Sequence, residues 1–184
     1  MEDLTRRRLL VRGTALALAA VPFADALAQA ATAPSGIFRE LDRSLRGDVV
    51  QRGAPGYNAA RVLYDTRFDG IKPQAIAYCE SLADVQKTVR WARKHNVRIV
   101  ARSGGHSYGG YSTTTGVVVD VSRLHAVSLA ANGRAATGAG AKLLDLYTKL
   151  AAGGRTVPAG TCGTVGIGGL AQGVGSACRR ASSD

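Results

Sequence analysis

One glycine-rich turn in the sequence combines groups that can bind an anion with a side chain that can react. Gly104 and Gly105 expose backbone N–H groups, and the hydroxyls of Ser103 and Ser107 flank them. Several donors in a concave turn suit a pyrophosphate, whose anionic oxygens need short hydrogen bonds. His106 stands beside this predicted anion site, so its imidazole could react with the ligand. A hydrogen-bonded structural histidine is the alternative, because a glycine-rich turn alone has little specificity.

A second glycine-rich segment, residues 158–169, contains a cysteine. It lacks the Gly-Lys-Ser/Thr of a Walker loop and the clean strand and downstream acidic residue of a Rossmann fingerprint. The thiol of Cys162 stands in an open glycine setting, and an accessible thiolate is a nucleophile. A small buried cysteine without chemistry is the alternative.

The cysteine set is odd and has no C-x-x-C spacing: Cys79, Cys162 and Cys178. This spacing disfavours a zinc site, so no metal ligand is predicted. A disulfide between Cys79 and Cys162 is a further alternative, which we rank below a special role for Cys162.

Four ordered motifs between about residues 65 and 173 resemble those of one family. They are Arg-x-Gly-Gly-His-Ser-Tyr from residue 102, Gly-Val-Val-Val-Asp-Val-Ser-Arg-Leu from residue 116, Gly-Ala-Gly-Ala from residue 138, and Gly-x-Cys-x-Thr-Val-Gly-x-Gly-Gly from residue 160. Together they resemble the FAD-linked oxidases of the p-cresol methylhydroxylase (PCMH) and vanillyl-alcohol oxidase type, most closely the berberine-bridge-enzyme-like branch. Four motifs in order at matching intervals are far more specific than any one of them. The resemblance implies the N-terminal part of a PCMH-type FAD-binding domain over residues 36–175.

The resemblance further implies FAD held by two covalent bonds. The family's histidine, joined to the 8α-methyl of the isoalloxazine ring, corresponds to His106, and its cysteine, joined to ring carbon C6, corresponds to Cys162. The other cofactor-binding residues implied are Ser103, Gly104, Gly105 and Ser107 at the pyrophosphate, and Thr161, Thr164, Gly166 and Gly168 near the flavin and its phosphates.

The family's chemistry sets the expected reaction. Its members pass a hydride from a substrate C–H bond to the flavin while a base takes a proton, and many return the electrons to dioxygen as hydrogen peroxide. The substrate implied is a small molecule: a sugar, an aromatic alcohol or an alkaloid-like compound. No catalytic residue is assigned, since the base is expected in the substrate domain that follows this part of the family's chains.

The hydrophobic pattern predicts the elements that must position these turns. Apolar runs predict strands over residues 75–79, 98–102, 117–120, 127–129 and 135–137, the last two joined at Asn132-Gly133. Helical periodicity predicts helices over residues 36–50, 82–95 and 142–152. Such a mixed order is typical of an α+β fold, and the first glycine-rich turn follows the strand at 98–102.

The predicted helix over 82–95 has a clear start. Ser81 precedes it, and Asp84 follows three residues later, which is the pattern of a helix N-cap. Its predicted buried stripe is Leu82, Val85, Val89 and Ala92.

The first thirty residues have the features of an export signal. Three consecutive arginines at residues 6–8 precede an uncharged Ala/Leu-rich stretch and small-x-small cleavage sites near residues 26–30. This pattern predicts a twin-arginine signal peptide over 1–30 and a periplasmic or secreted protein. The apolar stretch is well short of the ~20 residues of a membrane-spanning helix, so no membrane anchor is expected.

Composition bounds the remaining possibilities. The formal net charge of +11 invites a nucleic-acid partner, but the charges are scattered and aromatic residues are few, so none is expected. Many of the 23 glycines lie between residues 104 and 175, interleaved with Val, Ile and Leu, which favours folded binding loops over a linker.

The end of the chain departs from the family pattern. Residues 176–184 are polar, Arg/Ser-rich and aperiodic where the family continues with more glycines. We expect a prematurely ended or frameshifted reading frame here. An FAD-binding remnant without turnover is therefore the alternative to an active oxidase.

Overall fold

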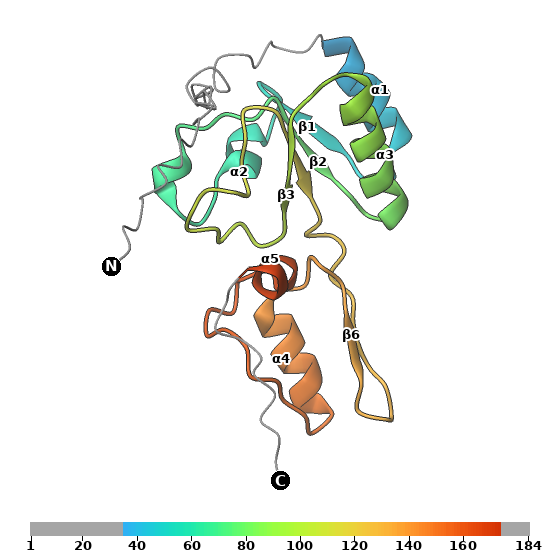
Figure 1. The fold of residues 1–184 in the computed structure, drawn as a ribbon, viewed down its shortest axis with the longest axis vertical. Coiled ribbons are helices and arrows are strands. Elements are labelled where there is room, and N and C mark those ends of the chain that lie inside the picture. The colour runs from blue at the N-terminus through green and yellow to red at the C-terminus, as the bar shows by residue number, and fades with distance from the viewer. Residues whose placement is uncertain (1–34, 174–184) are drawn as a thin grey trace, which may run out of the picture. The chain divides into compact units, whose positions relative to one another are not determined.

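The computed structural model describes residues 35–173, and the predicted signal peptide and the tail over 176–184 lie outside the described residues. Helices and strands alternate irregularly along the chain, which confirms the α+β prediction (Figure 1). The elements in order are α1 Ser35–Ser44, β1 Val49–Gln51, α2 Tyr57–Arg61, the 3-10 turn η2 Thr66–Phe68, β2 Ala75–Tyr78, α3 Leu82–Lys94, β3 Ile99–Arg102, β4 Val117–Asp120, β5 Val127–Leu129, β6 Ala135–Thr137, α4 Leu143–Ala152 and α5 Ile167–Gln172.

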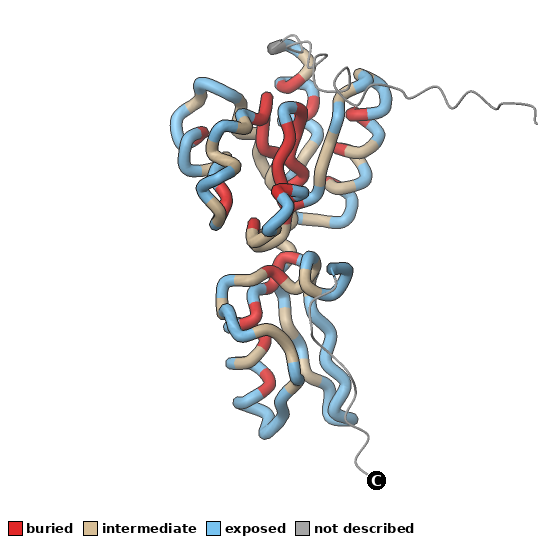
Figure 2. Tube along the Cα trace, turned by 60° about the vertical axis from the view of Figure 1, so that its left-hand side comes forward, coloured by how far each residue is buried: buried red, intermediate tan, exposed pale blue. Residues whose placement is uncertain are grey.

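The main sheet has four strands in the order β1-β2-β4-β3. Strands β2, β4 and β3 are parallel, and β1 adds antiparallel to β2 at the edge. The central strands β2 and β4 are four residues long. They are buried, as Figure 2 shows, because helices cover both faces of the parallel sheet. Arg102 pairs in register with Asp120, so the loops that follow β3 and β4 leave the same edge of the sheet.

Helices α1 and α3 pack on one face of this sheet. Phe38 and Trp91 lie with ring centroids 5.5 Å apart and share a buried cluster with Ala75 and Val117. In a second buried cluster, Tyr57 of α2 packs with Ile76 and Val118. Continuous apolar runs thus form the core, as the pattern predicted.

The predicted cap of α3 is confirmed, but its predicted buried stripe is partly wrong. The Ser81 hydroxyl accepts a hydrogen bond from the backbone N–H of Asp84 at 3.1 Å. Leu82 is 75% exposed, whereas Asp84 is fully buried. The carboxylate of Asp84 accepts hydrogen bonds from the backbone N–H groups of Arg46 and Glu80. Burial opposes its ionisation, yet these amide donors keep the pKa of Asp84 below its ordinary value.

Two predicted boundaries need correction. The first helix ends at Ser44 rather than at residue 50, and residues 49–51 form β1 instead. The short helix α2 was not predicted. Both segments are too short for periodicity to identify.

The hairpin and the helix that follows it are confirmed. Strands β5 and β6 pair antiparallel around a turn in which Gly133 has a φ of +80°. Helix α4 ends at Ala152 with Gly153 as its C-cap, and Gly154 beyond it adopts a φ of +65°. Helix α5 was not predicted; it begins inside the second glycine-rich segment.

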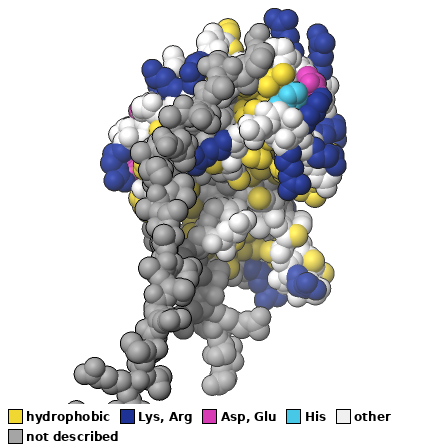
Figure 3. All heavy atoms as spheres, turned by 45° about the horizontal axis from the view of Figure 1, so that its top comes forward, with side chains coloured by type: hydrophobic (Ala, Val, Ile, Leu, Met, Phe, Trp, Pro, Cys, Tyr) yellow, Lys and Arg dark blue, Asp and Glu magenta, His cyan; other side chains and the backbone are white. Residues whose placement is uncertain are grey.

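The described surface carries many basic side chains. Figure 3 shows Lys and Arg spread over several parts of one face rather than in a single stripe. No helix of the described residues is long and apolar enough to cross a membrane. Residues 35–173 also contain no group of three or more His, Cys, Asp or Glu that could hold a metal ion.

Candidate functional site

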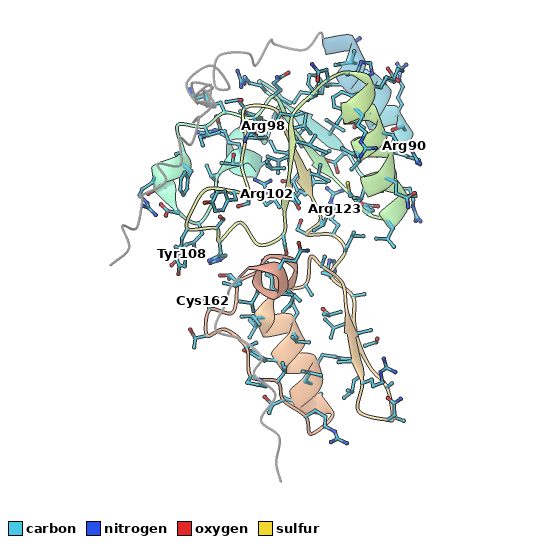
Figure 4. All side chains as sticks on the ribbon, in the orientation of Figure 1. Arg90, Arg98, Arg102, Tyr108, Arg123 and Cys162 are labelled. Carbon is cyan, nitrogen blue, oxygen red and sulfur yellow. The ribbon has the colours of Figure 1, made fainter. Side chains whose placement is uncertain are left out.

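A buried ion pair closes the end of β3, immediately before the first glycine-rich turn. Arg102 Nε donates to Asp120 Oδ2 at 2.6 Å, and both side chains are about one-twentieth exposed. A second guanidinium nitrogen of Arg102 donates to the carbonyl of Ala60, and Asp120 Oδ1 accepts from the backbone N–H of Ser122. The pair fixes the direction in which the chain leaves the sheet, and Figure 4 shows Arg102 within the ribbons of this region.

The turn that follows presents its backbone N–H groups. Gly105 has a φ of +71°, a conformation that favours glycine. None of the six N–H groups from Gly104 to Gly109 donates to a protein acceptor within residues 35–173. Consecutive free N–H groups in a tight turn form a concave anion site.

The second glycine-rich segment is tied to the start of α4. Leu143 donates its backbone N–H to the carbonyl of Val165, and Leu144 donates to the carbonyl of Gly163. Ile167, the first residue of α5, donates to the carbonyl of Ala141. These bonds hold residues 163–167 against the chain that leads into α4.

The two segments meet, although some 60 residues separate them in sequence. A Cβ atom placed on Gly104 would clash with the backbone nitrogen of Gly166 and lie 2.8 Å from the carbonyl oxygen of Thr164. Ser103 Oγ donates to the carbonyl of Ala139 at 2.6 Å. His106 Nε2 and Thr164 Oγ1 are hydrogen-bonded at 2.9 Å. Backbone packing and a side-chain hydrogen bond therefore join the two turns.

The imidazole of His106 is held from a second side by Tyr64. The two rings stack with centroids 4.2 Å apart and an interplanar angle of 21°. The backbone N–H of Tyr64 donates to the carbonyl of Gly105 at 3.2 Å. Burial lowers the pKa of His106, and the positive charge of Lys142 lowers it further. The ring is therefore neutral at pH 7 and can act as a nucleophile.

The two described cysteines differ in environment. Cys162 is exposed and its thiol is free, and Figure 4 shows it at the outside of its loop. Cys79 is also free but fully buried, and burial raises the pKa of its thiol to about 11. The alternative of a Cys79–Cys162 disulfide is therefore wrong.

The serines predicted at the pyrophosphate have protein partners of their own. Ser107 Oγ accepts a hydrogen bond from the backbone N–H of Tyr111, and Ser103 bonds Ala139. Gly168 donates its N–H to the carbonyl of Ala139, whereas the Thr161 side chain is exposed and makes no hydrogen bond in the described part of the chain. The O–H of Ser103 is therefore used within the protein, whereas the free donors of the first turn are its amides and the O–H of Ser107.

Comparison with known families identifies the domain. Residues 73–183 match a family model described as an FAD-binding domain. The chain belongs to this FAD-binding domain family. It is 35% identical over 130 residues to (R)-6-hydroxynicotine oxidase of Paenarthrobacter nicotinovorans, covering 70% of this chain and 28% of that protein.

Other relatives place this FAD-binding domain among the FAD-linked oxidoreductases and confirm the resemblance to the berberine-bridge-enzyme-like (BBE-like) branch. Chitooligosaccharide oxidase of Gibberella zeae is 36% identical over 124 residues, covering 65% of this chain and 25% of that protein. The structure of BBE-like 1 from Physcomitrella patens matches with a TM-score of 0.70 at 35% identity, covering 75% of this chain and 31% of that one. The chain thus spans less than a third of the length of these relatives.

The residues present fit FAD. The pyrophosphate of FAD is an anion that needs several hydrogen-bond donors, and the turn over residues 104–109 supplies N–H groups without protein partners. A neutral imidazole and a free, exposed thiol lie on the two turns that this FAD-binding domain brings together.

Sequence reasoning missed three parts of the site: Tyr64, the Arg102–Asp120 pair and Ala139. The ion pair had a visible signal, because a charged residue ends each of two apolar strands. Tyr64 and the carbonyl of Ala139 had none, since their contacts depend on the path of the chain between elements. Tyr108 and Tyr111 are exposed by 78% and 82%.

Proposed function

We propose that this chain is the FAD-holding part of an exported oxidoreductase in which His106 and Cys162 both bond to the cofactor. The supporting observation is the junction of the two turns, where His106 contacts Thr164, two residues from Cys162. Bound FAD would supply hydride acceptance from a substrate C–H bond and return of the electrons to dioxygen. The amides of residues 104–109 would hold its pyrophosphate.

The proposed substrate is a small alcohol-type molecule: a sugar, an aromatic alcohol or an alkaloid-like compound. Two relatives support this range, one named for 6-hydroxynicotine and the other for chitooligosaccharides. The proposed route of export is the twin-arginine pathway, which moves folded proteins and so suits a protein that acquires its cofactor in the cytoplasm.

The covalent bonds are testable on the purified chain. The chain is expressed with FAD supplied, precipitated in acid and examined for retained visible absorbance and a mass increase of one FAD. The variants His106→Ala and Cys162→Ala should each keep one bond to FAD, and the double variant should keep none. His125→Ala serves as the matched control, because His125 is exposed and its ring nitrogen lies at hydrogen-bond distance from the carbonyl of Ser122.

Two results would contradict parts of this proposal. A wild-type chain that binds FAD but releases all of it in acid would refute the covalent bonds. Retention of FAD without peroxide production from any sugar, aromatic alcohol or alkaloid would favour FAD binding without turnover.

A further inference from the structure

We propose that Thr164 positions His106 for its bond to FAD, by holding Nε2 and leaving Nδ1 as the ring nitrogen with the free electron pair, while Tyr64 fixes the plane of the ring. This inference rests on the proposed covalent function. It assigns a positioning role to a threonine of the cysteine-bearing turn. One turn would then serve both bonds to the cofactor.

The hydrogen bond to Thr164 selects the tautomer of His106 if the hydroxyl oxygen accepts from Nε2–H, which is the direction we propose. A neutral imidazole has one N–H donor and one acceptor nitrogen, and the partner of one nitrogen decides which form is present. Thr164 Oγ1 lies 2.9 Å from Nε2, and Nδ1 has no protein partner within residues 35–173. When Nε2–H donates to the hydroxyl oxygen, Nδ1 carries the electron pair that a nucleophile needs.

Tyr64 restrains the ring independently of Thr164. Its ring stacks on the imidazole at 4.2 Å, and its backbone N–H is hydrogen-bonded to the carbonyl of Gly105. Tyr64 is 66% exposed, so burial in the core does not explain where it lies. The stacking sets the plane of the imidazole and the hydrogen bond sets its rotation within that plane. Together they fix one orientation.

The bond-forming step balances with dioxygen as the oxidant. One C–H bond of the flavin methyl group breaks, and a bond forms between that carbon and the imidazole nitrogen. The imidazole loses the Nε2 proton, which Thr164 is placed to accept and pass to solvent. Two electrons would pass through the flavin to dioxygen, which would leave as hydrogen peroxide with two protons, equal in number to the one lost from the methyl group and the one lost from Nε2.

The first test measures covalent FAD at each residue separately. Apo wild type, Thr164→Val, Thr164→Ser and Thr148→Val are mixed with FAD in air, and peptides carrying His106 and Cys162 are quantified over time by mass spectrometry. Thr164→Val should slow formation of the His106 adduct about tenfold, which is the effect of losing one hydrogen bond. The rate of formation of the Cys162 adduct should stay unchanged. Thr164→Ser should restore the rate, and Thr148→Val, an exposed position on α4, should match wild type.

The stacking has its own pair of variants. Tyr64→Phe keeps the ring and should leave the rate of the His106 adduct unchanged, whereas Tyr64→Leu should slow it severalfold. Equal rates for Thr164→Val and wild type would overturn the role of Thr164.

A second measurement needs no FAD. Long-range ¹H–¹⁵N NMR of the apo chain should show His106 with the proton on Nε2 in wild type and in Thr164→Ser, and a mixture of tautomers in Thr164→Val. A proton on Nδ1 in wild type, or the same tautomer in Thr164→Val, would overturn the inference. If no variant forms an adduct at either residue, the covalent function fails, and the NMR result alone decides whether Thr164 positions the ring.

Discussion

Removal of one partner of the Arg102–Asp120 pair should destabilise the protein strongly. Both side chains are about 5% exposed, so Asp120→Ala leaves a guanidinium out of water with the carbonyl of Ala60 as its remaining acceptor. The variant also leaves the backbone N–H of Ser122 without its carboxylate acceptor. Breaking a buried pair from one side costs about 3–5 kcal/mol.

The size of this effect can be measured by thermal unfolding. For a chain of this length each kcal/mol lowers Tm by roughly 2–4 °C, so Asp120→Ala should lower Tm by roughly 6–20 °C. Circular dichroism at a helix wavelength follows the transition, and urea unfolding gives the free energy directly. Arg102→Met/Asp120→Leu removes both charges and should cost much less than Asp120→Ala, because no unpaired charge stays buried.

The double-mutant cycle decides whether the pair acts as argued. Coupling between two contacting residues should make the double variant more stable than the sum of the single losses predicts. A loss below about 1 kcal/mol for Asp120→Ala would refute the reasoning, since that is the value of an exposed pair. Additive losses would refute it too.

Gly104→Ala should weaken FAD binding at least tenfold in a titration, because its Cβ would force the turn away from Gly166, whereas Gly36→Ala, with nothing within 4 Å, should not. The pKa of His106 is lowered, so the neutral, nucleophilic ring persists below its ordinary pKa of about 6.5. The rate at which His106 bonds to FAD should therefore begin to fall only at a pH below that value. Lys142→Gln removes a positive charge that lowers this pKa, so it should move the fall in rate to higher pH. Iodoacetamide at pH 8 should alkylate Cys162 and spare Cys79, whose buried thiol has a pKa of about 11, as peptide mass mapping would show; equal labelling would contradict this contrast.

Every strand except β1 was predictable from the sequence, but the order of the strands in the sheet was not. Strands β2 and β4 are continuous apolar runs bounded by polar residues, which is the pattern of a buried strand. No local sequence pattern predicts that β4 lies between β2 and β3, because strand pairing depends on contacts between distant segments. The sheet edge that carries the site, where β3 and β4 end, could therefore be identified only from the structure.

Two local errors have clear physical causes. Periodicity placed Leu82 in the core, but Leu82 is exposed and Asp84 is buried instead. The carboxylate of Asp84 can be buried because backbone N–H groups donate hydrogen bonds to it. Helix α5 contains two glycines, which disfavour a helix by ~1 kcal/mol each. It forms because Ile167 and Gly168 are tied to Ala141 and Ala139 through their backbone N–H groups.

The concentration of glycines has two causes, of which the sequence indicated one. Several glycines lie where a Cβ would clash with a backbone carbonyl, as at Gly116 against Arg98 and Gly140 against Val121. These glycines allow strands and loops to pack backbone to backbone. Gly104 differs, because it packs against Gly166 and also begins the run of free N–H groups. A substitution there would separate the two turns that carry His106 and Cys162, whereas one at Gly116 would disturb the sheet, so FAD affinity and stability should respond separately at these two positions.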